Sequence, residues 1–262
     1  MSSFLYLCMA MRKFLLVIVL CITATVGWFV WSVISDTRCS LPGGNYIAHA
    51  GGVIEGYAYT NSKEAVEHSI ECGIRHIELD LKLTSDSFVV AAHSWREFNE
   101  MCGNKDLDHI PTLAEFGKMR IHGKFTPLTY MDIDSLMAAH PDVVLVADKL
   151  CIPKVIDRFL GKYRDRVMVE CFDIYAYYYF MDHGYLMSMY ASPKAERLEM
   201  YLRRWLHLKR SRYDAAVLYK GNEAMYPLCG CKLVYTARDR QEADSIFSHD
   251  SDVKFVYIDN VE

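Results

Sequence analysis

A histidine stands at each end of the stretch from residue 49 to residue 93, and two acids, Glu78 and Asp80, lie two positions apart within it. Imidazole has an unperturbed pKa near 6.5, so His49 and His93 can take up and release protons close to neutral pH. Carboxylates are hard oxygen ligands, which prefer Ca²⁺ or Mg²⁺ to zinc. These residue types could therefore combine proton transfer with cation binding, provided that the fold brings them together.

The two acids belong to a run in which apolar and polar residues alternate. In this run Ile77, Leu79, Leu81 and Leu83 stand between Glu78, Asp80 and Lys82. A period of two predicts a strand with one apolar face. The sequence Thr-Ser-Asp-Ser at residues 84–87 predicts a turn, and residues 88–93 predict a returning strand.

The register of this hairpin decides what the acids face. With a two-residue loop at Ser85-Asp86, the expected partners on the polar face are Glu78 with His93 and Asp80 with Ala91. The expected apolar face consists of Ile77, Leu79, Leu81, Leu83, Phe88, Val90 and Ala92. Two acids and a histidine side by side favour a functional site, and an ordinary solvent-facing hairpin is the alternative.

Other strands and helices are expected to position these groups. Residues 46–49 and 143–148 predict strands that end in His49 and Asp148, and later strands are expected at residues 167–172, 215–219, 232–236 and 254–258. Helices are expected at residues 62–72, 131–137, 174–189 and 196–212. Strands that alternate with helices over about 220 residues predict an α/β fold, a single TIM-type (β/α)8 barrel, whose active groups gather at the carboxyl ends of the strands. The tight hairpin makes the barrel irregular, because parallel strands need longer connections.

An apolar run without charges, residues 14–34, precedes the barrel. It is long enough to cross a bilayer at about 1.5 Å per residue. Arg12 and Lys13 precede it and Asp36 and Arg38 follow it, so the positive-inside rule places the N-terminus in the cytoplasm. We therefore expect a single-pass membrane protein with an extracytoplasmic domain, and a cleaved signal peptide is the alternative.

These features divide the chain into four segments. They are a cytoplasmic N-terminus (1–13), a transmembrane signal anchor (14–35), a linker (36–45) and the barrel domain (46–262). Met11 is an alternative start of translation.

Composition limits the kinds of partner. The 262 residues are 52% hydrophobic, which is enough for one large domain and an accessory segment. A net charge of −4, with no sustained basic block at either end, gives no reason to expect nucleic acid as a partner. The nine cysteines show neither the paired spacing of a zinc site nor an even-numbered disulfide framework, so we expect most of them to be buried as small hydrophobic residues.

The order of these motifs resembles that of the glycerophosphodiester phosphodiesterase family, which belongs to the phosphatidylinositol-phospholipase-C-like superfamily. The matching pieces are His49-Ala50-Gly51-Gly52, Asn61-Ser62 with Ala65, Gly73, Glu78-Leu79-Asp80, Thr84-Ser85-Asp86 and His93. Val234-Tyr235-Thr236 and Ile258-Asp259 resemble the closing strands of the family, so the likeness covers nearly all of residues 45 to 260. Each piece alone is common, whereas the pieces in register are specific.

The resemblance implies a fold, a reaction and a set of site residues. The fold is the TIM-type barrel, and the reaction is the metal-dependent cleavage of a glycerophosphodiester, a lipid head group or a glycerol-phosphate-modified glycan. The implied site has His49 and His93 as catalytic acid and base, Glu78, Asp80 and Asp148 as ligands of Ca²⁺ or Mg²⁺, and Lys82, Lys149 and Glu170 as substrate-binding residues. The attacking hydroxyl would be the substrate's own.

The chain departs from the family pattern at several positions. The arginine that follows the first histidine in the family is Ala50 here, and the aspartate that follows the second is Ser94. The third carboxylate, Asp148, is adjacent to Lys149, whereas the family usually places Glu two residues before Lys. Loss of an arginine clamp weakens phosphate recognition. The alternatives are therefore a barrel without turnover that serves as a membrane-tethered binding or scaffold protein, and another phosphate-ester or phosphotransfer enzyme on the same barrel.

Overall fold

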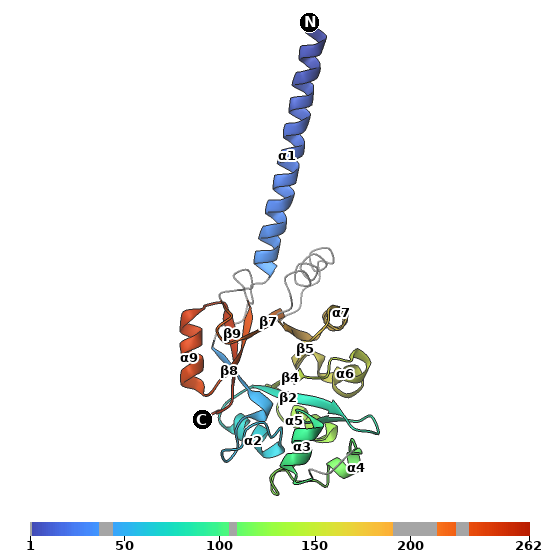
Figure 1. Ribbon diagram of the computed structural model, residues 1–262, viewed down its shortest axis with the longest axis vertical. Coiled ribbons are helices and arrows are strands. Elements are labelled where there is room, and N and C mark those ends of the chain that lie inside the picture. Colours follow the sequence, from blue (N-terminus) through green and yellow to red (C-terminus); the bar gives the residue numbers. More distant parts are fainter. Residues whose placement is uncertain (1, 37–43, 105–108, 191–213, 224–230) are drawn as a thin grey trace.

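Eight parallel strands form a closed barrel in the computed structural model (Figure 1), which describes residues 2–36, 44–104, 109–190, 214–223 and 231–262. The barrel strands are β1 (Asn45–Ala48), β2 (His76–Leu83), β4 (Val144–Asp148), β5 (Val167–Cys171), β6 (Leu186–Tyr190), β7 (Asp214–Tyr219), β8 (Lys232–Ala237) and β9 (Val253–Ile258). The ring closes because β1 pairs with both β2 and β9. The predicted TIM-type barrel is therefore confirmed.

The barrel is irregular at the predicted hairpin. Strand β3 (Val89–Ala91) lies antiparallel on the outer part of β2. The predicted register is wrong by one residue, because Leu81 pairs with Ala91 and the Asp80 carbonyl accepts from the amide of Ala92. The loop contains three residues and ends at Ser87, whose φ of 64° is the left-handed conformation typical of such loops.

This shift changes which side chains share a face. Val89 and Ala91 pack on the face of Leu81, whereas Val90 and Ala92 belong to a separate core under the 95–125 segment. His93 consequently lies beyond β3 and is not the cross-strand partner of Glu78.

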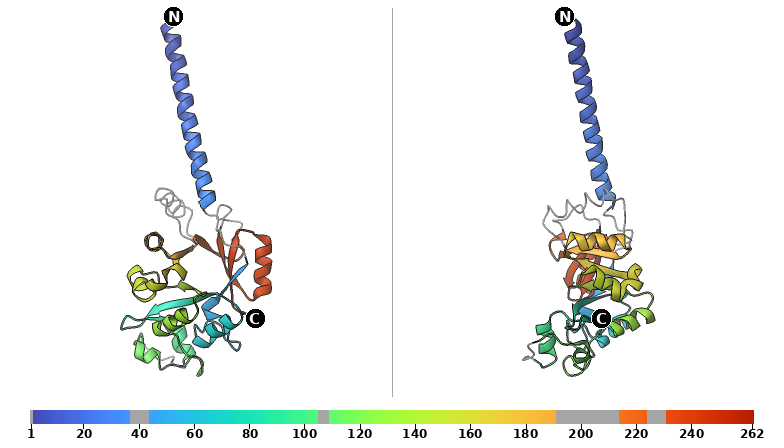
Figure 2. Two further views of the ribbon diagram at one scale, coloured as in Figure 1. Left: turned by 180° about the vertical axis from the view of Figure 1, so that it is seen from behind. Right: turned by 90° about the vertical axis from the view of Figure 1, so that its right-hand side faces the viewer.

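Helices cover the outside of the barrel (Figure 2). They are α2 (Lys63–Glu71), α3 (Trp95–Met101), α4 (Leu113–Phe116), α5 (Tyr130–Ala139), α6 (Pro153–Leu160), α7 (Ile174–Asp182) and α9 (Arg240–His249), with 3-10 turns at His49–Gly51 and Gly161–Arg166. The predicted helix at 62–72 is confirmed, with Ser62 as N-cap. The predicted helix at 174–189 ends at Asp182, and its last residues form β6. The predicted helix at 196–212 lies outside the described residues.

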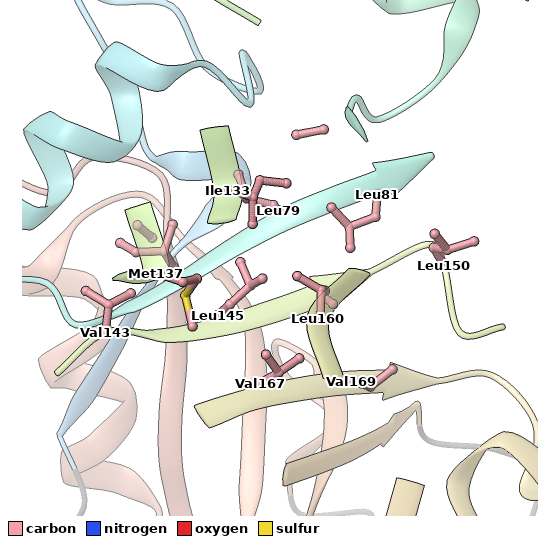
Figure 3. Packing of buried hydrophobic residues seen from close by; sticks show 14 of the residues in the cluster. Leu79, Leu81, Ile133, Met137, Val143, Leu145, Leu150, Leu160, Val167 and Val169 are labelled. Atoms are coloured by element: carbon pink, nitrogen blue, oxygen red, sulfur yellow. The ribbon is translucent and has the colours of Figure 1, made fainter. Parts of the chain in front are cut away.

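Alternation along each strand separates two apolar cores. Outward-facing residues pack against the helices, and Figure 3 shows Leu79, Leu145 and Val167 in this layer beside Ile133 and Met137 of α5. Inward-facing residues fill the barrel with a second cluster: Ile47, Val146, Met168, Leu186, Ala215, Val217, Cys231, Leu233, Phe255 and Tyr257. Buried polar side chains, among them Glu78, Glu170 and Ser188, lie on the same strands as this inner cluster.

The N-terminal helix α1 (Ser2–Asp36) projects from the barrel as one long element (Figures 1 and 2). The segment Met11–Trp31 within it is long and apolar enough to cross a membrane. The same length and composition are also found in signal sequences, so the helix alone does not distinguish an anchor from a cleaved leader.

Gly52 closes the turn after β1 and provides a test of packing beside the barrel mouth. Its φ is +94°, and a Cβ there would lie 2.4 Å from Ser69 Oγ and 3.1 Å from Val261 Cγ1. Gly52→Ala should lower the free energy of unfolding by about 2 to 5 kcal/mol, because a left-handed conformation costs about 1–2 kcal/mol and overpacking about 1–3 kcal/mol. Urea unfolding measures this loss.

Gly56→Ala is the matched control, since Gly56 has a φ of +80° and no neighbouring heavy atom within 4 Å of its added Cβ. It should show the conformational cost alone. Equal losses in the two variants would contradict the packing argument.

Candidate active site

Three acids meet at the carboxyl ends of two neighbouring barrel strands. Parallel pairing of β2 with β4 sets Asp80 beside Asp148, and Glu78 lies one inward-facing position earlier on β2. Oxygen atoms of the three carboxylates all lie within 4.8 Å of one another, and all three side chains are buried. The acids that the sequence analysis singled out thus form one cluster, the acid cluster below.

The electrostatics of the acid cluster favour a bound cation. Burial, together with the nearby Asp80 and Asp148, raises the pKa of Glu78 well above its ordinary value. Glu78 Oε2 accepts a hydrogen bond of 2.5 Å from the Ala50 amide, while its buried Oε1 has no hydrogen-bond partner among the described residues. A buried oxygen without a donor, next to two further carboxylates, fits an oxygen-binding divalent ion.

Groups from three loops compensate part of this charge. The Asn61 amide donates to Asp80 Oδ2 over 2.9 Å, and Lys149 Nζ lies 2.9 Å from Asp148 Oδ2 and 3.9 Å from Asp80 Oδ1. Together with Ala50, these two residues have positive φ angles of 48°, 48° and 63°. Left-handed backbone in non-glycine residues costs free energy and is concentrated at functional sites.

His49 lies in the 3-10 turn after β1, with a side-chain exposure of only 2%. Its Nδ1 is 2.8 Å from Asp259 Oδ1, and its Nε2 is 2.9 Å from the Tyr235 hydroxyl. The ring of Tyr59 packs edge-on against it at 4.6 Å between centroids. Both ring nitrogens are therefore engaged with protein groups.

His93 is more accessible. It follows β3, and its Nδ1 is hydrogen-bonded to Glu97 Oε2 in the first turn of α3, which Ser94 caps. The proximity of His93 lowers the pKa of Asp80, although burial has the larger, opposite effect. The Tyr59 ring makes edge-on contacts with both histidine rings, at 4.6 Å from His49 and 6.1 Å from His93 between centroids.

A cavity of about 490 Å³ opens over these groups. Its walls are Tyr59, His93, Glu97, Glu100, Met101, Lys149 and Tyr235. The volume lies in the range of small-molecule sites. One wall comes from α3, the helix that follows the hairpin.

The three residues predicted to bind substrate differ in position. Lys149 lines the cavity next to the acid cluster. Lys82 lies on β2 beyond Asp80, and no ion pair joins it to the acids in the described part of the chain. Glu170 is fully buried, accepts a hydrogen bond from Tyr257 and is not among the residues that line the cavity.

Several contacting residues were not assigned from the sequence. Asn61 and Asp259 belong to recognised motifs without a stated role, whereas Tyr59 carries no signal beyond its residue type. Glu97 could have been found from its i+4 spacing to His93 on a helix capped by Ser94. Tyr235 and Asp259 contact His49 from β8 and from the end of β9, and only the closed barrel brings them there.

Comparisons of the sequence and of the structure with known proteins both point to one family of barrel proteins. A sequence model described as the glycerophosphoryl diester phosphodiesterase family matches residues 49–228. No curated protein sequence matches the chain.

Solved structures share the fold at low sequence identity. A glycerophosphoryl diester phosphodiesterase from Parabacteroides distasonis is 16% identical with a TM-score of 0.60, and 88% of each chain is covered. A phosphodiesterase from Oleispira antarctica, solved in complex with the product sn-glycerol-3-phosphate, is 17% identical with a TM-score of 0.61, covering 84% of this chain and 93% of that one.

Cation binding by the acid cluster should stabilise the folded protein. A cation at 100 times its dissociation constant adds about 2.7 kcal/mol to the free energy of unfolding. Adding Ca²⁺ or Mg²⁺ to chelator-treated protein should therefore raise Tm, and Asp148→Asn should abolish the rise. Glu170→Gln is the control, because its amide oxygen can still accept from Tyr257 and it lies outside the cluster.

The same experiment has a pH dependence. Because the pKa of Glu78 is raised, protons compete with the cation at higher pH than for an ordinary carboxyl group. The cation-induced rise in Tm should therefore shrink as the pH falls, and this loss should begin at a higher pH than for an ordinary carboxylate site. A rise that survives Asp148→Asn unchanged would show that the cation binds elsewhere.

Proposed function

The chain belongs to the glycerophosphoryl diester phosphodiesterase family and is a phosphoric diester hydrolase, and from that premise we propose that it is a membrane-anchored, cation-dependent enzyme in which His49 and His93 move protons. The proposed substrate is a small glycerophosphodiester or a lipid-derived or glycan-bound relative. The observation that carries the proposal is one cavity whose walls contact both sets of groups. His93 and Lys149 line it, and Lys149 pairs with the acid cluster. His49 lies behind the cavity wall, hydrogen-bonded to Tyr235.

The residues of the site divide the chemical work. A divalent cation held by Glu78, Asp80 and Asp148 would neutralise the diester's charge and polarise its phosphorus. Glu97 is hydrogen-bonded to Nδ1 of His93. Nε2 is therefore the nitrogen that can exchange a proton with a substrate in the cavity. We assign His93 the transfer of a proton to the leaving alcohol.

Lys149 supports phosphate recognition in this proposal. Ala50 leaves the site without the arginine that the family pattern places there. The Lys149 ammonium lines the cavity, and the neighbouring Asp148 and Asp80 raise its pKa although burial opposes them. It can therefore supply a positive charge, without the planar fork of a guanidinium. Lys82 and Glu170 remain predictions as substrate ligands.

The size of the substrate follows from the cavity and from a neighbour. The Oleispira antarctica phosphodiesterase was solved with the product sn-glycerol-3-phosphate, which is a small polar molecule. A cavity of about 490 Å³ accommodates a diester of that product with a small alcohol.

A binding protein without turnover is the second candidate. Ala50 and the engagement of both His49 nitrogens favour it, because a catalytic imidazole needs a nitrogen that can exchange protons with the substrate. Hydrolysis separates the two candidates, and selectivity for phosphomonoesters would indicate a third, another phosphate-ester enzyme on this barrel.

Activity tests the proposed function directly. The purified full chain in detergent should hydrolyse glycerol-3-phosphocholine in the presence of Ca²⁺ or Mg²⁺ and stop when the cation is chelated. His93→Ala should lower kcat on the order of 10²-fold, whereas His122→Ala should not, because His122 is stacked on Tyr57 at the surface.

A substrate with a better leaving group sharpens the assignment of His93. The p-nitrophenyl diester of glycerol phosphate needs little protonation of its leaving oxygen, so His93→Ala should affect it far less. Full activity of His93→Ala on the choline diester would contradict the assignment. Binding of the diester without turnover would support the second candidate.

Membrane anchoring is tested separately. The full chain should sediment with membranes and resist extraction by alkaline carbonate, whereas a fragment of residues 44–262 should remain in the supernatant and keep its activity. A processed chain that begins after Asp36 in the supernatant of cells expressing the full gene would instead identify a cleaved leader.

A further inference from the structure

The two histidines have unequal access to the cavity. The side chain of His93 is 34% exposed and lines the cavity wall. His49 is buried and does not line the cavity, and its Nε2 faces the hydroxyl group of Tyr235, which does. A substrate in the cavity therefore meets Tyr235 before it can meet His49.

The neighbours of Tyr235 hold it in this position. Its ring packs against Tyr257 at 4.6 Å between centroids, and the Tyr257 hydroxyl is itself bound to Glu170. Tyr219, its partner on β7, lies edge-on to the Tyr235 ring at 6.4 Å between centroids. Strand β8 and two aromatic neighbours thus fix the phenol between His49 and the cavity.

The hydrogen bonds define which way a proton can move. The Asp259 carboxylate accepts, so Nδ1 of His49 carries the hydrogen of that bond. Nε2 of the neutral ring is then an acceptor, and the Tyr235 hydroxyl donates to it. In this arrangement the pair can receive a proton from the cavity side and cannot deliver one.

We propose that Tyr235 is a catalytic residue that connects His49 to the substrate. The Tyr235 oxygen takes the proton of the attacking hydroxyl while its own proton moves to His49 Nε2, and the attacking oxygen forms its bond to phosphorus. The leaving alcohol departs with its bonding electron pair and receives a proton from His93. The proposal rests on the proposed function and adds a residue and a proton path to it.

The surroundings suit both ends of this path. Asp259 stabilises the imidazolium that forms, as a carboxylate does for the histidine of a serine protease. Burial and the four carboxylates Glu78, Glu170, Asp148 and Asp80 raise the pKa of Tyr235, so the phenol is protonated at neutral pH and can donate a hydrogen bond to His49. Neither end requires a group from outside the chain.

The test compares Tyr235→Phe with Tyr219→Phe in the full chain in detergent. Tyr219 is an exposed tyrosine in register with Tyr235 on the adjacent strand and outside the cavity, so its variant controls for loss of one phenol from the aromatic cluster. Tyr235→Phe should lower kcat on the order of 10²-fold with KM little changed, on both the choline diester and the p-nitrophenyl diester. Tyr219→Phe should leave both constants at the wild-type level.

A solvent isotope measurement distinguishes a relay from a packing role. Two protons move together in the wild type, so its rate should depend nonlinearly on the fraction of D₂O, whereas the residual rate of Tyr235→Phe should depend on it linearly. Wild-type or higher activity of Tyr235→Phe overturns the proposal, and higher activity would show that the phenol blocks His49. A linear dependence in the wild type also overturns it. Absence of hydrolysis by the wild type would instead refute the proposed function.

Discussion

Repulsion among three buried carboxylates is the constraint around which the mouth of the barrel is built. Parallel pairing of β2 with β4 sets Asp80 beside Asp148, and alternation along β2 brings Glu78 to the same side. Like charges held this close in a buried site need compensation. The Ala50 amide, the Asn61 amide and the Lys149 ammonium supply part of it, each from a residue in a left-handed conformation. The free energy spent on these strained residues is consistent with a site maintained for binding and not for stability alone.

This arrangement also explains why alanine at position 50, where the family pattern has arginine, still supports the acid cluster. The contact of this position with Glu78 is made by the backbone amide, which every residue type except proline provides. Alanine therefore preserves the support of the acid cluster while removing any side-chain contact with a phosphate. In the proposed enzyme the fully buried alanine leaves phosphate recognition to other groups, such as Lys149, which follows β4 and lines the cavity.

Much of the fold follows from patterns that are local in the sequence. Continuous apolar runs marked β4 and β5, strict alternation marked β2, and Ser62 with Gly73 marked the ends of α2. The hairpin register did not follow, because the residue types at Ser85 to Ser87 suit loops of either two or three residues, and the left-handed φ of Ser87 that marks the longer loop is known only from the structure. Strand β6 was missed because an apolar, aromatic-rich segment continues from α7 into it, and only three residues, His183 to Tyr185, separate the two elements. The acid cluster was predictable from strand ends, whereas the partners of His49 come from β8 and β9 and depend on barrel closure.

The direction of β1 determines how the mouth of the barrel is oriented relative to helix α1. Helix α1 leads into the amino end of β1, while the acid cluster lies at the carboxyl ends of the strands. All barrel strands are parallel, so α1 joins the end of the barrel formed by the amino ends of the strands. The acid cluster lies at the opposite end. With α1 embedded in a bilayer, an upright barrel would turn its opening toward the surrounding fluid or toward an apposed surface, roughly 15–20 Å, the length of a five-residue strand, farther out. This orientation would favour diesters that diffuse freely or that project from a facing envelope. It would be less suited to phospholipids of the leaflet that holds α1.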